Sequence, residues 1–334
     1  MKGSISRRDF LLRGSAAAGA CYGLFASSYA TSAPAAAGNN FHGIFAILQT
    51  PFNNNDHVDW GDLEREVNFC VRAGDHGLVW PQLAGEFYLL SEEERTRGAE
   101  VILHAAAGRT NVVIGVQAPS SGLALKFAQH AEAHGADALI ALPPYLGSVG
   151  VESAGSYYRT LAQGVKLPIF IQNSGAPWGP ALPTDFVIQL ARENPQFAYV
   201  KEEVSPVARR IGEYARSGVM KGIFSGSAGR NLLDELSHGA AGTMPACQFT
   251  DVSVQIYNLV AQGKIPEARE IFEKLLPMIN LEEIYGLAFM KEVLVRRGVF
   301  TTAKLRGLAG GGLDSLDRRE LDEWWQELAP YLKA

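Results

Sequence analysis

Short apolar runs alternate with amphipathic stretches from residue 41 to about residue 263, and this alternation constrains the fold more than any other feature. The apolar runs cover residues 43–48, 77–80, 111–116, 138–142, 168–171, 197–200, 222–224 and 242–244. Most are continuous and rich in β-branched residues, as in strands buried on both faces of a parallel sheet. Eight such units in strict alternation predict an α/β fold, the closed (β/α)8 TIM barrel. A doubly wound open sheet is the alternative, but no G-x-G-x-x-G follows the first run.

The amphipathic stretches carry helix signals. Between residues 60 and 73, Leu63, Val67 and Val71 are spaced four apart and form one apolar stripe. The segment 91–94 reads S-E-E-E, a capping box with acids in the first turn of a helix. After residue 263 the pattern changes to three helices without strands, over 265–279, 284–297 and 317–332. These helices predict a C-terminal appendage, which a glycine-rich linker at 307–312 interrupts.

The chain therefore divides into four predicted parts: a signal peptide (1–30), a linker (31–40), a barrel (41–263) and C-terminal helices (264–334). Arg7 and Arg8 precede a weakly apolar run, and Ser28 and Ala30 offer small residues to a signal peptidase. This order is typical of a twin-arginine signal. It predicts export by the twin-arginine machinery, removal of the signal near Ala30 and a periplasmic location. Cys21 leaves a lipoprotein site open as a minor alternative.

Composition excludes several classes of function. Apolar residues make up 47% and charged residues 19% of the chain, as expected for a soluble globular enzyme. The net charge of −5 argues against a nucleic-acid or anionic-membrane partner. Beyond the signal only Cys70 and Cys247 remain, and the seven histidines are scattered along the sequence. We therefore expect no disulfide framework, no structural metal and no cofactor.

The working site of such a barrel lies where the strands end, at the C-terminal face. That rule selects Thr50, Gln82, Glu86, Gln117, Pro144, Tyr145, Asn173, Lys201, Ser225 and Pro245. Lys201 ends an apolar run and is followed by two glutamates. Burial favours the neutral form of a lysine amine, and a neutral amine can form a Schiff base with a keto group. A solvated lysine just past a strand is the alternative. If Lys201 points into the barrel, alternation places Tyr199 inward and Val200 and Glu202 outward.

Six short motifs in this order resemble the dihydrodipicolinate synthase/N-acetylneuraminate lyase family of class I aldolases, over about residues 41–330. They are T-P-F at 50–52, G-E-F at 85–87, P-P-Y at 143–145, V-K-E at 200–202, S-G-S at 225–227 and G-A-A-G at 239–242. The resemblance implies a TIM barrel, a Schiff base at Lys201, a 2-keto acid substrate and a dimer or tetramer.

The departures from the family pattern are equally informative. Leu83 and Ala84 replace two hydroxyl residues that relay protons and bind carboxylate in the family, and Leu146 replaces the family's second tyrosine. The substrate-binding arginine of the synthases is absent, and Trp178 enters the same stretch. These changes argue against the lysine-biosynthetic reaction and favour a bulkier substrate. Another group must then replace the proton relay, with Tyr145, Glu86, Gln82 or a water as candidates.

The sequence predicts a Schiff-base lyase, an aldolase or dehydratase acting on pyruvate or a sugar-derived 2-keto acid. Lys201 is the expected nucleophile and Tyr145 the expected acid or base. The expected substrate-binding residues are Thr50, Gln82, Glu86, Asn173, Gly226 and Pro245. Two alternatives stay open: a non-catalytic periplasmic small-molecule-binding protein on the same barrel, and an enzyme that uses the lysine as a general base.

Overall fold

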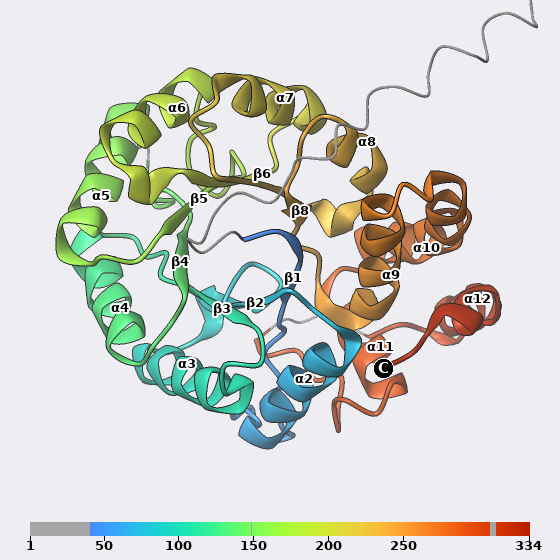
Figure 1. Ribbon diagram of the computed structural model, residues 1–334. Coiled ribbons are helices and arrows are strands. Elements are labelled where there is room, and N and C mark those ends of the chain that lie inside the picture. Colours follow the sequence, from blue (N-terminus) through green and yellow to red (C-terminus); the bar gives the residue numbers. More distant parts are fainter. Residues whose placement is uncertain (1–40, 148, 308–311) are drawn as a thin grey trace, which may run out of the picture. The chain divides into compact units, whose positions relative to one another are not determined.

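The predicted strands form one closed parallel barrel in the computed structural model, which describes residues 41–147, 149–307 and 312–334 (Figure 1). The strands are β1 (Gly43–Ile47), β2 (Gly77–Trp80), β3 (Asn111–Gly115), β4 (Ala138–Ala141), β5 (Ile169–Asn173), β6 (Tyr199–Glu202), β7 (Gly222–Ser225) and β8 (Gly242–Thr243). The last strand pairs with the first, with Gly242 opposite Gly43. The (β/α)8 prediction is therefore confirmed. The predicted signal peptide and linker lie outside the described residues.

Helices surround this ring (Figure 1). They are α2 (Trp60–Ala73), α3 (Glu92–Ala106), α4 (Ser121–Ala133), α5 (Val151–Gly164), α6 (Thr184–Glu193), α7 (Val207–Ser217), α8 (Leu232–Ser237) and α9 (Thr250–Ala261). Three more follow without strands and confirm the appendage: α10 (Ile265–Tyr285), α11 (Leu287–Arg296) and α12 (Ser315–Leu328). None of the described helices is both long and apolar enough to cross a bilayer.

Local signals set the helix ends. Asp59 caps α2, because its carboxylate accepts hydrogen bonds from the backbone N–H groups of Gly61 (3.1 Å) and Asp62 (3.0 Å). The predicted capping box of α3 is confirmed, since Ser91 and Glu94 exchange side-chain to backbone hydrogen bonds of 2.9 and 3.1 Å. These two caps fix where the loops after β1 and β2 end at the C-terminal face of the barrel.

The strand β6 starts two residues later than its apolar run suggests. Pro195 begins a 3-10 turn that includes Phe197, so the strand starts at Tyr199 and contains Lys201. In register, Lys201 lies opposite Gln172 on β5 and Phe224 on β7. Lys201 therefore lies within the ring of hydrogen-bonded strands, where its backbone is held on both sides.

Aromatic side chains fill the inside of the barrel. Phe45 and Phe224 lie 4.9 Å apart between ring centroids, and Phe170 and Tyr199 lie 5.1 Å apart. Phe41, just before β1, joins this inner cluster. Because aromatic rings fill the interior and its N-terminal end, chemistry is confined to the C-terminal end. Tyr199 thus points inward as predicted.

A buried carboxyl on α2 couples the fold to pH. Glu66 is fully buried, and its Oε1 accepts from the backbone N–H of Gln49 (2.8 Å) and the thiol of Cys247 (3.0 Å). Burial raises the pKa of Glu66 to about 8, although these hydrogen bonds and Lys291 oppose the rise. The carboxyl is therefore mostly protonated at neutral pH.

This raised pKa predicts how stability depends on pH. The proton on Glu66 favours the folded state, so its contribution is complete below the ordinary pKa of 4.5 and is lost as pH rises through about 8. Glu66→Gln should remove this dependence, which amounts to at most about 1.4 kcal/mol per pH unit. Urea unfolding between about pH 5 and pH 8 measures it, with the exposed Glu64→Gln on the same helix as control. Identical pH slopes for wild type and Glu66→Gln would contradict the assignment.

Candidate active site

Lys201 is buried inside the ring at its C-terminal end. Its side chain is 3% exposed, and its Nζ lies 3.4 Å from Oε1 of Glu203. The strand alternation predicted for this segment is observed: Tyr199 joins the inner cluster, while Val200 packs in the outer cluster between strands and helices. The amine is thus held in the interior beside a single carboxylate, a geometry that supports proton exchange between the two groups.

Glu203 is kept as a carboxylate by its neighbours. Its Oε2 accepts from Gln172 Nε2 at 2.9 Å and from the hydroxyl of Ser174 in a short hydrogen bond. Burial raises the pKa of Glu203, but the charge of Lys201 and these hydrogen bonds outweigh it and hold the pKa below its ordinary value. Gly226 leaves room for this group, because a Cβ there would collide with the Glu203 carboxylate. Gly226, an expected substrate-binding residue, therefore borders the site through Glu203.

Glu202 points to the face of β6 opposite to that of Lys201. Its carboxylate contacts Arg210 (3.1 Å) and accepts from the hydroxyl of Tyr214 (2.8 Å) on α7. The Nδ2 of Asn173 donates to the same carboxylate at 3.0 Å and to the carbonyl of Leu182 at 2.9 Å, while its Oδ1 accepts from the backbone N–H of Leu182 at 2.8 Å. The structure therefore places Asn173 outside the ring with Glu202, and does not bring it to Lys201.

Gln172, and not the predicted Asn173, is the amide of β5 that lies beside Lys201. It lies opposite Lys201 in the β5–β6 register, whereas Asn173 lies opposite Glu202. Because neighbours in register point to the same face, Gln172 faces inward with Lys201. Its Oε1 is buried without a hydrogen-bond partner among the described residues. The sequence does not reveal the register between β5 and β6. That register is the signal that distinguishes the inward-facing Gln172 from Asn173.

The predicted residues after β1 and β2 form a polar wall. Thr50 donates to the carbonyl of Gly85 at 2.5 Å and accepts from Trp80 Nε1 at 3.1 Å. Gln82 donates to Gln117 at 3.0 Å, and its own Oε1 is buried without a partner in the described part of the chain. Thr50 thus orders the loop after β2, while Gln82 retains a free acceptor.

Glu86 forms an ion pair with the buried Lys291 of α11. Its backbone is left-handed, with a φ of 53°, and burial raises the pKa of its carboxyl against the pull of Lys291. Both side chains are fully buried. The ion pair links the C-terminal helices to the β2–α3 loop. Glu86, which was expected to bind substrate, therefore has a structural contact.

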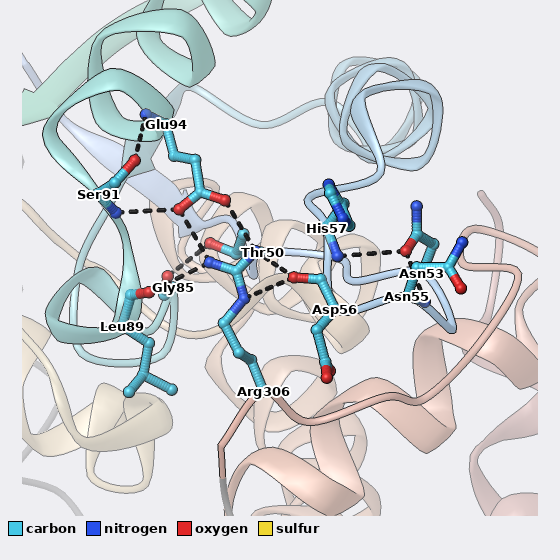
Figure 2. A network of polar contacts seen from close by, with 10 residues as sticks. All are labelled: Thr50, Asn53, Asn55, Asp56, His57, Gly85, Leu89, Ser91, Glu94 and Arg306. Carbon is cyan, nitrogen blue, oxygen red and sulfur yellow. Dashed lines mark hydrogen bonds and ion pairs between the residues drawn. The ribbon is translucent and has the colours of Figure 1, made fainter.

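Arg306 joins the same loops from the segment after α11. Figure 2 shows its guanidinium between Glu94 (2.7 and 2.8 Å) and the backbone carbonyl of Asp56 (2.9 Å from Nε), with Leu89 alongside. Bidentate contacts of this kind fix both position and orientation. The loops that follow β1 and β2 are therefore held in one arrangement at the barrel mouth.

Tyr145 belongs to an aromatic cluster contributed by three loops. Its ring lies 5.5 Å from Phe87 and 6.1 Å from Trp178, and Trp178 stacks on Tyr88 at 5.4 Å. Burial raises the pKa of Tyr145, although Arg95 lowers it, so the phenol stays protonated and can donate a hydrogen bond. The cluster gives the C-terminal face an aromatic side, as expected for a substrate larger than pyruvate.

Pro245 lies just after β8, where its carbonyl accepts from the backbone N–H of Ile47 at 2.8 Å. This bond extends the seam between the last and first strands. Nearby, Ser225 donates to Glu235 and lies 3.0 Å from the hydroxyl of Thr243. Pro245 therefore shapes the rim through its backbone, and its side chain has no polar atom to offer a substrate.

Comparisons with known proteins agree with this architecture. A model of the dihydrodipicolinate synthetase family matches residues 40–308. The chain is 29% identical over 261 residues to an L-2-keto-3-deoxyarabonate dehydratase of Azospirillum brasilense, with 77% of this chain and 84% of that protein covered. It is 30% identical over 251 residues to a probable 2-dehydro-3-deoxy-D-pentonate aldolase of Escherichia coli (strain K12), with 74% and 82% covered.

Synthases also resemble the chain. A 4-hydroxy-tetrahydrodipicolinate synthase of Methanocaldococcus jannaschii is 27% identical over 242 residues, with 72% of this chain and 82% of that protein covered. A crystal structure of a dihydrodipicolinate synthase superposes with a TM-score of 0.80 at 26% identity, covering 86% of this chain and 99% of that one. Since the family model spans most of the barrel and appendage, the chain belongs to the dihydrodipicolinate synthetase family.

Proposed function

We propose that this protein is a lyase that forms a Schiff base between Lys201 and a sugar-derived 2-keto acid. Family membership supports the chemistry, and two of its relatives are named for a dehydratase and an aldolase of 3-deoxy-2-keto pentonates. The observation that carries the proposal is the Lys201 amine, 3% exposed at the C-terminal end of the ring and 3.4 Å from a carboxylate.

The reaction begins with proton transfer from the Lys201 ammonium to Glu203. The neutral amine attacks the C2 carbonyl carbon, and one of its protons moves to the carbonyl oxygen to give a carbinolamine. Protonated Glu203 then donates its proton to that hydroxyl, so that water leaves and the protonated imine forms. The protonated imine withdraws electrons from C3. In dehydration, C3 loses a proton to give an enamine, which expels the C4 hydroxyl with a proton as water. In aldol cleavage, the C4 hydroxyl loses its proton and the C3–C4 bond breaks to give an aldehyde and an enamine, which takes up a proton at C3. Water then hydrolyses the imine and frees Lys201.

Glu203 is our proposed replacement for the family's second tyrosine, whose place Leu146 takes. Leu146 is 65% exposed and has no group that transfers a proton. Glu203, in contrast, is within reach of the amine and joined to the hydroxyl of Ser174. Tyr145 stays a predicted acid or base, and its protonated phenol is suited to donating.

Two unpartnered amide oxygens favour a hydroxylated substrate. Oε1 of Gln82 and Oε1 of Gln172 are both buried without partners among the described residues. Leaving a buried acceptor unpaired costs about 1–3 kcal/mol, which a substrate hydroxyl offsets by donating a hydrogen bond. Trp178, in the stretch where the synthases carry their arginine, argues against the lysine-biosynthetic reaction.

Covalent trapping tests the proposal directly. Borohydride added with pyruvate or a 3-deoxy-2-keto pentonate should leave a reduced adduct on Lys201, located by peptide mass spectrometry. The chain provides an internal control, because Lys201 and Lys291 are the two buried lysines of residues 41–147, 149–307 and 312–334. Lys291 is paired with Glu86 and should remain unmodified.

The Lys201→Ala variant supplies the matched control and should lose both the adduct and turnover. Calorimetric binding of a keto acid without any adduct on Lys201 would instead favour the non-catalytic binding protein. Absence of adduct across a panel of keto acids would remove the lyase proposal.

The proton-transfer role of Glu203 has a separate signature. Glu203→Gln should lower kcat by roughly 10²–10⁴ while some trapping on Lys201 persists. Ser174→Ala removes a hydrogen bond to the carboxylate, so the pKa of Glu203 should rise and the acidic limb of the kcat profile should move to higher pH. Steady-state rates between about pH 4 and pH 9 measure both effects. Full activity in Glu203→Gln would assign proton transfer to another group.

We further propose that the protein is exported by the twin-arginine machinery and works in the periplasm. The support is the Arg7–Arg8 pair and the apolar run that follows it. Replacing both arginines with lysine should retain a longer, signal-bearing form in the cytoplasm, which fractionation and intact-mass measurement detect. Unchanged periplasmic delivery of the double-lysine variant would contradict this route.

A further inference from the structure

The fold brings two histidines, four residues apart, next to a glutamate that lies 30 residues before the first of them. His130 lies on α4, His134 caps its C-terminal end, and Glu100 projects from the neighbouring helix α3 (Figure 1). The His130 Nε2 is 2.9 Å and the His134 Nε2 is 3.7 Å from the same Glu100 oxygen. Their ligand atoms all lie within 4.8 Å of one another. In the sequence the histidines look scattered. The cluster appears only in the fold, because Glu100 lies on a different helix from His130 and His134.

The protonation of His134 is set by its backbone contact. Its Nδ1 lies 2.8 Å from the carbonyl oxygen of His130, which can only accept a hydrogen bond. Nδ1 therefore carries the proton, and in the neutral ring Nε2 has a free lone pair on the side of Glu100. This is the arrangement of metal-binding histidines, whose second nitrogen usually donates to a carbonyl or carboxylate.

Distances and charge both suit a metal ion. Zinc bonds of about 2.0–2.2 Å in a tetrahedron place ligand atoms about 3.4 Å apart. This spacing lies between the 2.9 and 3.7 Å distances from the Glu100 oxygen to the two imidazole nitrogens. His130 and His134 also lie at the C-terminal end of α4, where the helix dipole favours a cation. His130 is 22%, His134 44% and Glu100 49% exposed, so water can complete the coordination.

We propose that Glu100, His130 and His134 form a binding site for a divalent transition metal, with Zn²⁺ as the probe. Two imidazoles and one carboxylate favour zinc, nickel or copper over magnesium or calcium, which prefer all-oxygen sites. Glu100 and His134 also line a cavity of about 430 Å³, together with His104 from the last turn of α3. The bound ion links α3 to α4 and is independent of the Schiff-base proposal.

Calorimetry with untagged, metal-free protein tests the site. Wild type should bind a single zinc ion per chain at about pH 7.5 and lose it at about pH 5, where protons compete for imidazole. His134→Ala and Glu100→Gln should each weaken binding at least roughly ten-fold, as loss of even an outer-shell partner does. Zinc should also raise the Tm of wild type and not of these variants.

The control is His238→Ala, which removes an exposed histidine paired with an aspartate on α8. It should bind zinc as wild type does, and circular dichroism melts should show that all variants fold. X-ray absorption of the loaded protein should report imidazole nitrogens at about 2.0–2.1 Å. Lack of saturable binding, or equal binding by wild type, His134→Ala and Glu100→Gln, would overturn the proposal.

Discussion

The contact between the Lys201 amine and the Glu203 carboxylate is the interaction on which the rest of the site depends. Both groups are largely withdrawn from water, so the charge on each is compensated chiefly by the other and by hydrogen bonds from Gln172 and Ser174. Gly226 supplies the space for the carboxylate. A proton can pass directly between the amine and the carboxylate. Imine formation requires such a transfer, because the amine must be neutral to attack a carbonyl carbon.

Adjacent residues of β6 have opposite roles because side chains alternate along a strand. Lys201 faces the interior, while Glu202 contacts Arg210 and Tyr214 on the outside. The outer contacts hold β6 against α7 and so keep the amine in position. On the other side of the mouth, the buried Lys291–Glu86 pair holds the loop after β2.

Much of the fold was predictable from sequence because its signals are local. Apolar runs located all eight strands, and the span 60–73 matched α2 at both ends. The start of β6 was misplaced because the 3-10 turn that begins at Pro195 extends into the apolar run 197–200. The site was harder, since Asn173 and Gln172 differ only in register, and Glu203 resembled an ordinary member of an acidic pair. The His130–Glu100 contact joins separate helices, which no local pattern reports.

A crystal structure of the protein soaked with pyruvate shows whether Lys201 forms the imine. We expect continuous density from Lys201 Nζ to C2 of the keto acid, with the Glu203 carboxylate beside the new imine nitrogen. An unmodified lysine still paired with Glu203, in crystals where pyruvate is bound elsewhere or not at all, would contradict this expectation.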